Sequence, residues 1–122
     1  MNYLMLGAIL GCLVVILGAF GAHGLKNKLS PEMMDIFQTG VQYHQIHTIA
    51  LLAIALLLGN SPSGVGTCAG WLFVTGIVIF SGSLYTLSIT EIRILGAITP
   101  IGGLAFLAGW ACLAWMGVQI RG

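Results

Sequence analysis

Three histidines are the residues of this chain best suited to chemistry, because imidazole can carry a proton, bind a metal or accept a hydrogen bond. They are His23, His44 and His47. On a helix, His44 and His47 share a face because they are three residues apart. Three imidazoles could bind zinc or copper, but no Asp, Glu or Cys lies close to the His44–His47 pair in sequence. We therefore assign no metal ligands and keep metal binding only as an alternative.

Motifs of catalytic and cofactor sites are missing from the sequence. It contains no His-Glu-x-x-His, no Walker loop, no Gly-x-Ser-x-Gly and no GxGxxG unit followed by an acid. A catalytic triad needs an acid near a histidine, and the three acids are Glu32, Asp35 and Glu91. The first two fit a helix start and the third fits a loop. We therefore expect a non-enzymatic protein without catalytic residues or cofactors.

The composition is that of a membrane protein. Of the 122 residues, 58% are hydrophobic and 6% charged, whereas soluble domains carry about a quarter charged residues. Membrane lipids are therefore the expected surroundings. The net charge of +1 argues against a nucleic-acid partner, which requires a basic face. Cys12, Cys68 and Cys112 each lie in an apolar run, where cysteine behaves as a small hydrophobe.

Four apolar segments have the length of about 20 residues that crosses a bilayer. They cover residues 4–22, 41–58, 67–87 and 94–118. Ser30-Pro31-Glu32 is typical of a helix start and leads through an amphipathic segment into the second span. The turn formers of residues 59–64 separate the second and third spans. We therefore predict an all-α membrane protein, with residues 1–122 forming a single antiparallel bundle of four transmembrane helices.

Charges and aromatic residues indicate an orientation. Lys26, Lys28 and Arg93 lie in loops on one side of the membrane, and Arg121 and the amino terminus lie on the other. The excess of basic residues predicts that both termini face outward. Trp71, Trp110 and Trp115 fit an aromatic belt at the far membrane surface.

The polar side chains fall in one half of the membrane. Counted from Leu58 at about 1.5 Å per residue, His47 lies roughly 17 Å and His44 roughly 21 Å away, both inside a hydrocarbon core of about 30 Å. The other helices place their polar residues in the same half. Unpaired polar groups are costly in lipid, so these residues are expected to meet. The candidate ligand-binding residues are His23, Tyr43, His44, His47, Ser81, Ser83, Tyr85 and Thr99.

This arrangement is compatible with several functions. The function we favour from the sequence is a polar intramembrane pocket for a small ligand, a lipid headgroup or a proton, with His23 and His47 as its polar centre. As an alternative, the polar residues only hold the helices together, at about 0.6 kcal/mol per polar pair. The glycine face of the first helix, with Gly7 and Gly11, favours a structural or assembly role beside a second copy or another membrane protein. A transporter or channel subunit would need a path through the other half, which is almost purely apolar.

Several sequence blocks resemble one known family. Residues 18–25 read GAFGAHGL, and further matches cover residues 37–51, 80–85 and 95–103. This pattern resembles domain of unknown function 423, the family of YgdD- and YwdK-like small inner-membrane proteins of bacteria with a similar eukaryotic transmembrane protein. The resemblance implies a multi-pass protein of the bacterial inner (plasma) membrane. It implies no activity, and it singles out seven of the eight candidates, all but His44, together with Pro100.

The chain departs from the family pattern before its second span. Gln38 occupies a position where the resemblance leads us to expect an acid, Gln42 one where we expect a base, and His44 one where we expect Gln. The first two changes look like the replacement of an ion pair by two amides. They count against a mechanism that depends on charge, and they make His44 a weaker candidate than His47.

Overall fold

A computed structural model describes residues 2–59 and 63–121, and within these ranges the chain is helical and contains no strand. Four of its helical columns are long and apolar enough to cross a membrane, which confirms the predicted all-α fold. The elements are α1 (Tyr3–His23), α2 (Pro31–Leu58), α3 (Gly64–Gly76), the π-helical turn η1 (Ile77–Ser81), α4 (Gly82–Thr90), the 3-10 turn η2 (Arg93–Ala97) and α5 (Thr99–Arg121).

Side chains cap the first two helices at their starts. The side chain of Asn2 accepts a hydrogen bond from the backbone N–H of Met5 at 3.0 Å. Ser30 accepts one from Met33 at 3.2 Å, and Pro31 occupies the first turn of α2, as the sequence predicts. α2 continues for 28 residues, or about 42 Å, so the expected amphipathic segment and span 41–58 form one helix. The predicted turn residues 60–62 lie outside the described residues.

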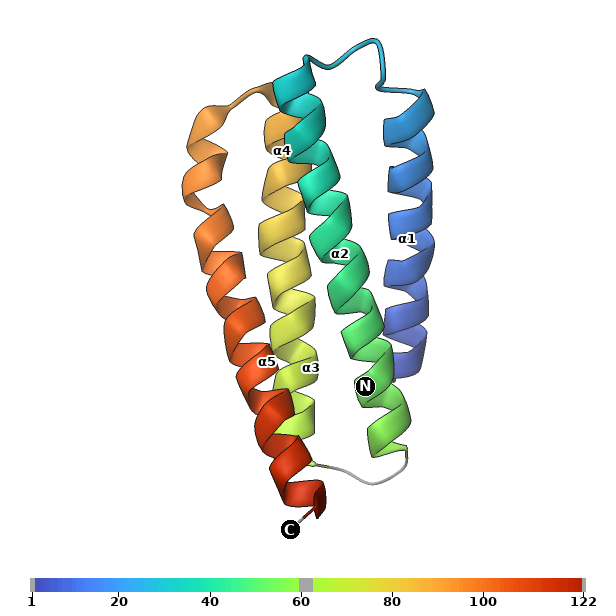
Figure 1. Cartoon of the computed structure of the whole chain (residues 1–122), viewed down its shortest axis with the longest axis vertical. Coiled ribbons are helices and arrows are strands. Elements are labelled where there is room, and N and C mark those ends of the chain that lie inside the picture. The colour runs from blue at the N-terminus through green and yellow to red at the C-terminus, as the bar shows by residue number, and fades with distance from the viewer. Residues whose placement is uncertain (1, 60–62, 122) are drawn as a thin grey trace.

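Neighbouring helices in the chain are also neighbours in space (Figure 1). α1 packs against α2, and α2 packs against the continuous α3–η1–α4 segment, which we call the third column. The third column in turn packs against α5. α1 and α5 therefore lie at the two edges of the bundle. Both termini lie at one end, and the α1–α2 loop and the α4–η2 connection lie at the opposite end. The expected glycine face of α1 is turned toward α2, since Gly7, Gly11 and Gly18 lie opposite Leu52, Thr48 and Val41 respectively.

A π-helical turn interrupts the third column where it meets α5. The backbone N–H of Gly82 reaches the carbonyl of Ile77, five residues earlier. A Cβ on Gly102 of α5 would collide with the backbone nitrogen of Phe80, so glycine allows the two backbones to approach closely. The proline of the fourth span lies at the start of a helix. Pro100 is the second residue of α5, where a missing N–H costs nothing.

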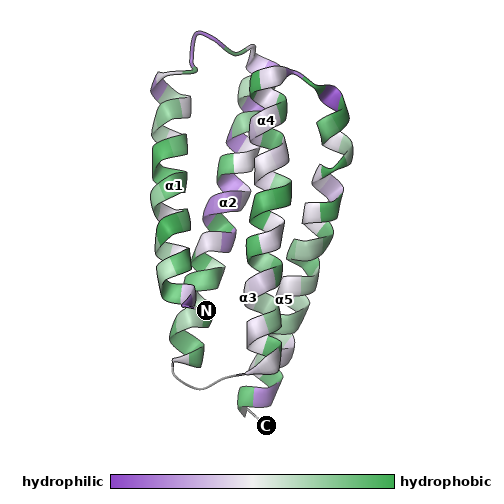
Figure 2. Cartoon of the chain, turned by 180° about the vertical axis from the view of Figure 1, so that it is seen from behind, coloured by the Kyte–Doolittle hydropathy of each residue, from purple (hydrophilic) through white to green (hydrophobic). Residues whose placement is uncertain are grey.

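The main buried apolar cluster lies in the half of the bundle nearer the termini, and most of the polar residues lie in the other half. One buried cluster joins residues of α1, α2, α3, η1 and α5, and includes Leu51, Ile54 and Phe73. Figure 2 shows hydrophilic colour along α2 in the half nearer the 24–30 loop and hydrophobic colour toward its other end. This is the one-sided distribution that the depth count predicts.

Candidate functional site: an interhelical polar cluster

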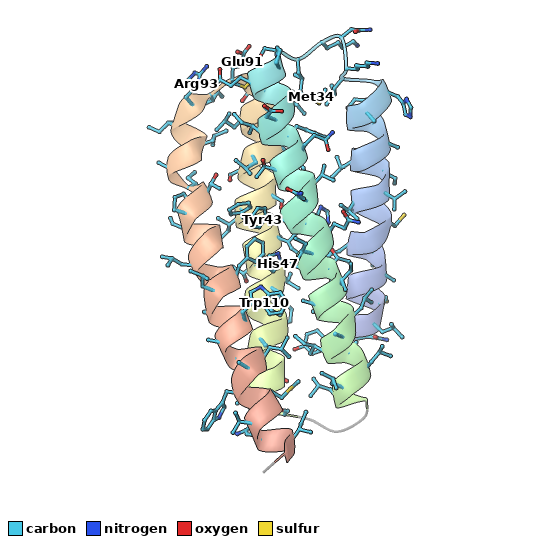
Figure 3. The ribbon with its side chains drawn as sticks, viewed as in Figure 1. Met34, Tyr43, His47, Glu91, Arg93 and Trp110 are labelled. Atoms are coloured by element: carbon cyan, nitrogen blue, oxygen red, sulfur yellow. The ribbon has the colours of Figure 1, made fainter. Side chains whose placement is uncertain are left out.

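His47 makes a hydrogen bond with each of its two ring nitrogens. Its Nδ1 lies 2.7 Å from the backbone carbonyl of Tyr43, and the indole Nε1–H of Trp110 donates to its Nε2 at 2.9 Å. An indole only donates and a carbonyl only accepts. His47 is therefore assigned as a neutral ring that carries its proton on Nδ1. Figure 3 shows Tyr43, His47 and Trp110 one below the other between α2 and α5.

Aromatic rings enclose the His47 side chain, which is 3% exposed. Its ring stacks on Phe106 with centroids 3.5 Å apart and an interplanar angle of 8°. Phe73 lies at 5.5 Å and Trp110 at 5.7 Å in an edge-on arrangement. A metal or ligand at His47 would have to displace one of its two hydrogen bonds and part of this aromatic packing.

His44 is paired at one nitrogen only. Its Nδ1 lies 2.9 Å from the hydroxyl of Tyr85 on α4, and its backbone carbonyl accepts a hydrogen bond from Thr48 at 2.8 Å. The side chain is 3% exposed. Its Nε2 has no hydrogen-bond partner among the described residues. Because buried polar atoms are almost always paired, this nitrogen is the exception in the cluster.

Hydroxyl groups tie the third column to both of its neighbours. Ser81 donates to the backbone carbonyl of Gly40 on α2 at 2.8 Å. Ser83 and Thr99 lie 2.6 Å apart across the contact with α5, and Ser83 donates to the carbonyl of Phe80 at 2.9 Å. Ser83 has a single hydroxyl hydrogen, so with that hydrogen on Phe80 the Thr99 hydroxyl donates to Ser83. Together with the bonds of His44 and His47, these contacts form the interhelical polar cluster.

The structure brings most of the predicted candidates together, but His23 lies apart from them. His23 is exposed at the end of α1. Gly18 lies opposite Val41, so His23 is more than one further helical turn toward the loops. Within residues 2–59 and 63–121, no hydrogen bond or ring contact joins His23 to the other candidates. The predicted polar centre formed by His23 and His47 is therefore not present in this arrangement.

Tyr43 and Trp110 enter the cluster differently from the sequence expectation. Tyr43 contributes its backbone carbonyl, while its ring packs on Phe80 with centroids 4.6 Å apart. Trp110 was expected in an interfacial belt, but it is the hydrogen-bond donor to His47. A tryptophan N–H needs an acceptor when it is removed from water. No spacing in the sequence identifies an acceptor 63 residues away.

The outer face of α2 carries polar side chains that the bundle leaves unpaired. Gln38, Gln42 and Gln45 are exposed, and we call them the amide stripe. Gln38 reaches the sulfur of Met34 at 3.9 Å, while in the described parts of the chain Gln42 and Gln45 make no hydrogen bond. An open hollow of about 370 Å³ lies on this surface. Its lining consists of α2 residues alone: Asp35, Gln38, Thr39, Val41, Gln42 and Gln45.

An ion pair connects two elements at the loop end of the bundle. Arg93 of η2 contacts Glu32 of α2 at 3.0 Å, with both side chains largely exposed. Figure 3 shows Arg93 and Glu91 together at this end, far from His47. Across the described residues, no three His, Cys, Asp or Glu side chains are grouped closely enough to hold a metal ion. Charged groups are thus separated from the polar cluster.

The known proteins that this chain resembles are UPF0382 membrane proteins of bacteria. The family profile described as "Protein of unknown function (DUF423)" matches residues 17–103. The UPF0382 membrane protein YwdK of Bacillus subtilis is 50% identical over 119 residues, covering 96% of each chain. A UPF0382 membrane protein of Staphylococcus epidermidis is 47% identical over 120 residues, covering 98% of each chain. No solved structure matches this chain.

Proposed function

This chain belongs to the DUF423 family of multi-pass membrane proteins, and from that premise we propose that it is a non-enzymatic structural subunit that binds a partner protein within the membrane. The observation that carries the proposal is where unpaired polar groups lie. Inside the bundle, each polar side chain of the cluster makes a hydrogen bond to another side chain or to a backbone carbonyl, and Nε2 of His44 is the one buried side-chain polar atom without a partner among the described residues. On the outer face of α2, the amides of Gln42 and Gln45 face outward without a partner among the described residues.

The depth of these amides supports a protein partner. Counted from Leu58, Gln45 lies about 20 Å and Gln42 about 24 Å along α2, so both fall inside a hydrocarbon core of about 30 Å. An amide exposed to acyl chains without a hydrogen bond carries a free-energy cost, and a polar contact between membrane helices recovers about 0.6 kcal/mol. A neighbouring membrane protein can remove that cost by supplying hydrogen-bond partners.

The interior of the bundle supports a structural rather than a catalytic role. His47 uses one ring nitrogen on a backbone carbonyl within α2 and the other on Trp110 of α5, and Ser83 and Thr99 use their hydroxyls on each other and on the backbone. None of these groups is arranged as a nucleophile beside a free base. Each polar contact contributes only about 0.6 kcal/mol, so the cluster acts jointly to hold α2, α4 and α5 in one arrangement.

Photocrosslinking in the native membrane tests this proposal. A benzophenone amino acid would replace Gln42 in one variant and Val15 in another. Val15 is 70% exposed on α1, at a similar depth, because its neighbours Gly11 and Gly18 lie opposite Thr48 and Val41. We expect a discrete protein adduct from position 42, identified by mass spectrometry, and lipid adducts alone from position 15. Lipid adducts alone from both positions would refute the proposal.

A second candidate function is a site for a small polar ligand or a proton at His44. The observation that favours it is the Nε2 atom of this buried ring, which lacks a partner in the described structure. Native mass spectrometry of the protein extracted from its own membrane would test for a ligand. A bound molecule of fixed mass in the wild type that is lost in His44→Phe would support this function, and a bare chain in both would count against a ligand.

A further inference from the structure

We infer that the partner is a second copy of this chain, and that two α2 helices pack side by side in parallel along their outer faces. This inference rests on the proposed function, and it names the partner for the same surface. The contact would follow one line of residues, which we call the α2 seam: Asp35, Gln38, Gln42, Gln45, Ile49, Leu52 and Leu56.

The spacing of the α2 seam is that of a coiled-coil contact. Successive members are alternately three and four residues apart, which is the 3.5-residue period of a left-handed helix pair. The seam lies on the outside of the bundle. Ile49 is 61% exposed and Leu56 is 77% exposed, and only Leu52 also packs on α1, opposite Gly7.

The neighbours of α2 leave this face free. Val41 and Thr48 are turned toward α1, Gly40 lies against Tyr85 of α4, and His47 meets Trp110 of α5. The contacts of α2 with the described helices therefore lie mainly on sides other than the seam. A second α2 could lie along the seam without displacing any helix of the first copy, and its side chains could enter the hollow formed by the amide stripe.

From Gln38 to Leu56 the chemistry of the seam matches a copy of itself, whereas Asp35 lies about 35 Å from Leu58 along α2, outside a hydrocarbon core of about 30 Å, where water can screen two like charges. Two copies inserted in the same orientation are related by a two-fold axis along the membrane normal, so each seam residue meets the same residue of its partner. An amide has both a donor and an acceptor, so Gln42 and Gln45 can pair with their own copies, and Ile49 and Leu56 continue the contact as apolar pairs. A phosphate headgroup would need cations here, but the one charged residue of the seam is the anionic Asp35.

Cysteine crosslinking in vesicles tests the inference. Cys12, Cys68 and Cys112 would first be replaced by Ala, and single cysteines would then be placed at Gln42, Gln45 and Val15 in the full chain. The purified variants would be reconstituted at high lipid excess in phosphatidylcholine vesicles and oxidised. We expect disulfide-linked dimers at positions 42 and 45 to form at least several times faster than at position 15. Equal rates at all three positions would indicate random collision and overturn the inference.

A second measurement covers the case in which cysteine itself disturbs the seam. Energy transfer between donor- and acceptor-labelled chains would give the association constant of the dimer in the same vesicles. Each of Gln42→Leu and Gln45→Leu should lower this constant by about threefold, the equivalent of about 0.6 kcal/mol per polar contact, while Val15→Leu should leave it unchanged. An unchanged constant in both glutamine variants would contradict the seam.

The failure of this inference is separable from failure of the proposed function. If purified protein stays monomeric while position 42 still gives a photoadduct with a different membrane protein, the second copy is the wrong partner and the structural role stands. If neither experiment yields a protein–protein adduct at position 42, both the partner and the structural role are wrong.

Discussion

The indole N–H of Trp110 donates a hydrogen bond to Nε2 of His47 at 2.9 Å, so a residue of α5 fixes the tautomer of a residue of α2. The carbonyl of Tyr43 receives the remaining ring proton at 2.7 Å. Both ring nitrogens of His47, which the sequence favours as a functional candidate over His44, are therefore bonded to protein atoms. Neither ring nitrogen of His47 is free for a ligand, whereas Gln42 and Gln45 on the outer face of α2 make no hydrogen bond within the described residues.

Trp110→Phe should destabilise the bundle because it leaves Nε2 of His47 without a donor. The expected loss is about 1–3 kcal/mol, the cost of an unsatisfied buried acceptor, measured by unfolding in mixed detergent micelles. Trp115→Phe is the matched control, since Trp115 lies on the same helix, is 56% exposed and makes no hydrogen bond within the described residues. Equal losses in the two variants would show that the bond to His47 contributes nothing.

The hydroxyl pair between Ser83 and Thr99 should show measurable coupling. Ser83→Ala and Thr99→Val each remove one side of a 2.6 Å contact between α4 and α5. In a double-mutant cycle, the free energy of unfolding should reveal a coupling of about 0.6 kcal/mol, the typical value for a polar contact in a membrane bundle. Ser88→Ala removes a bond within α4 instead, and combined with Thr99→Val it should give additive effects.

Gly102→Ala should be far more damaging than the same change elsewhere on α5. Its Cβ would meet the backbone nitrogen and Cα of Phe80, so α5 would have to move away from the π-helical turn, at a cost of about 1–3 kcal/mol. A Cβ on Gly117 meets nothing within 4 Å, so Gly117→Ala should be neutral or slightly stabilising. Comparable unfolding midpoints for both variants would contradict the close approach of α5 to the third column.

The ion pair between Glu32 and Arg93 should be dispensable. Both side chains are largely exposed, and water and salt screen such pairs strongly. We expect Glu32→Gln to unfold at the wild-type midpoint, at both low and high salt. A salt-sensitive loss of stability in the wild type that disappears in Glu32→Gln would show that this pair anchors η2 to α2.

The sequence predicts the fold and the depth of the polar residues in the membrane, because the thickness of the hydrocarbon core and the rise per helical residue are known. Four apolar segments predicted four spans, and Ser30 with Pro31 predicted the start of α2. The count from Leu58 placed His44 and His47 in the polar half, and the expected contact of α2 with Tyr85 is present as the His44 bond.

The pairing of individual atoms could not be predicted in the same way. Whether Trp110 lies at the surface or beside His47 depends on how far α5 is shifted along the third column, and that shift depends on the π-helical turn and on Gly102. His23 ends α1 more than one helical turn beyond the contact of Gly18 with Val41 and is exposed, so it lies outside the cluster. Depth is encoded locally, whereas the rotation and shift of each helix depend on its partners.

The position of the ring proton of His47 in lipid bilayers tests directly whether the polar cluster is paired as described. Solid-state nitrogen NMR of histidine-labelled protein, assigned by comparison with a His47→Gln variant, distinguishes a protonated ring nitrogen from a bare one. We expect a proton on Nδ1 and a bare Nε2 close to the indole N–H of Trp110. A proton on Nε2, or on both nitrogens, would show that Nε2 does not accept the Trp110 hydrogen bond. His47 would then again be a candidate ligand-binding residue.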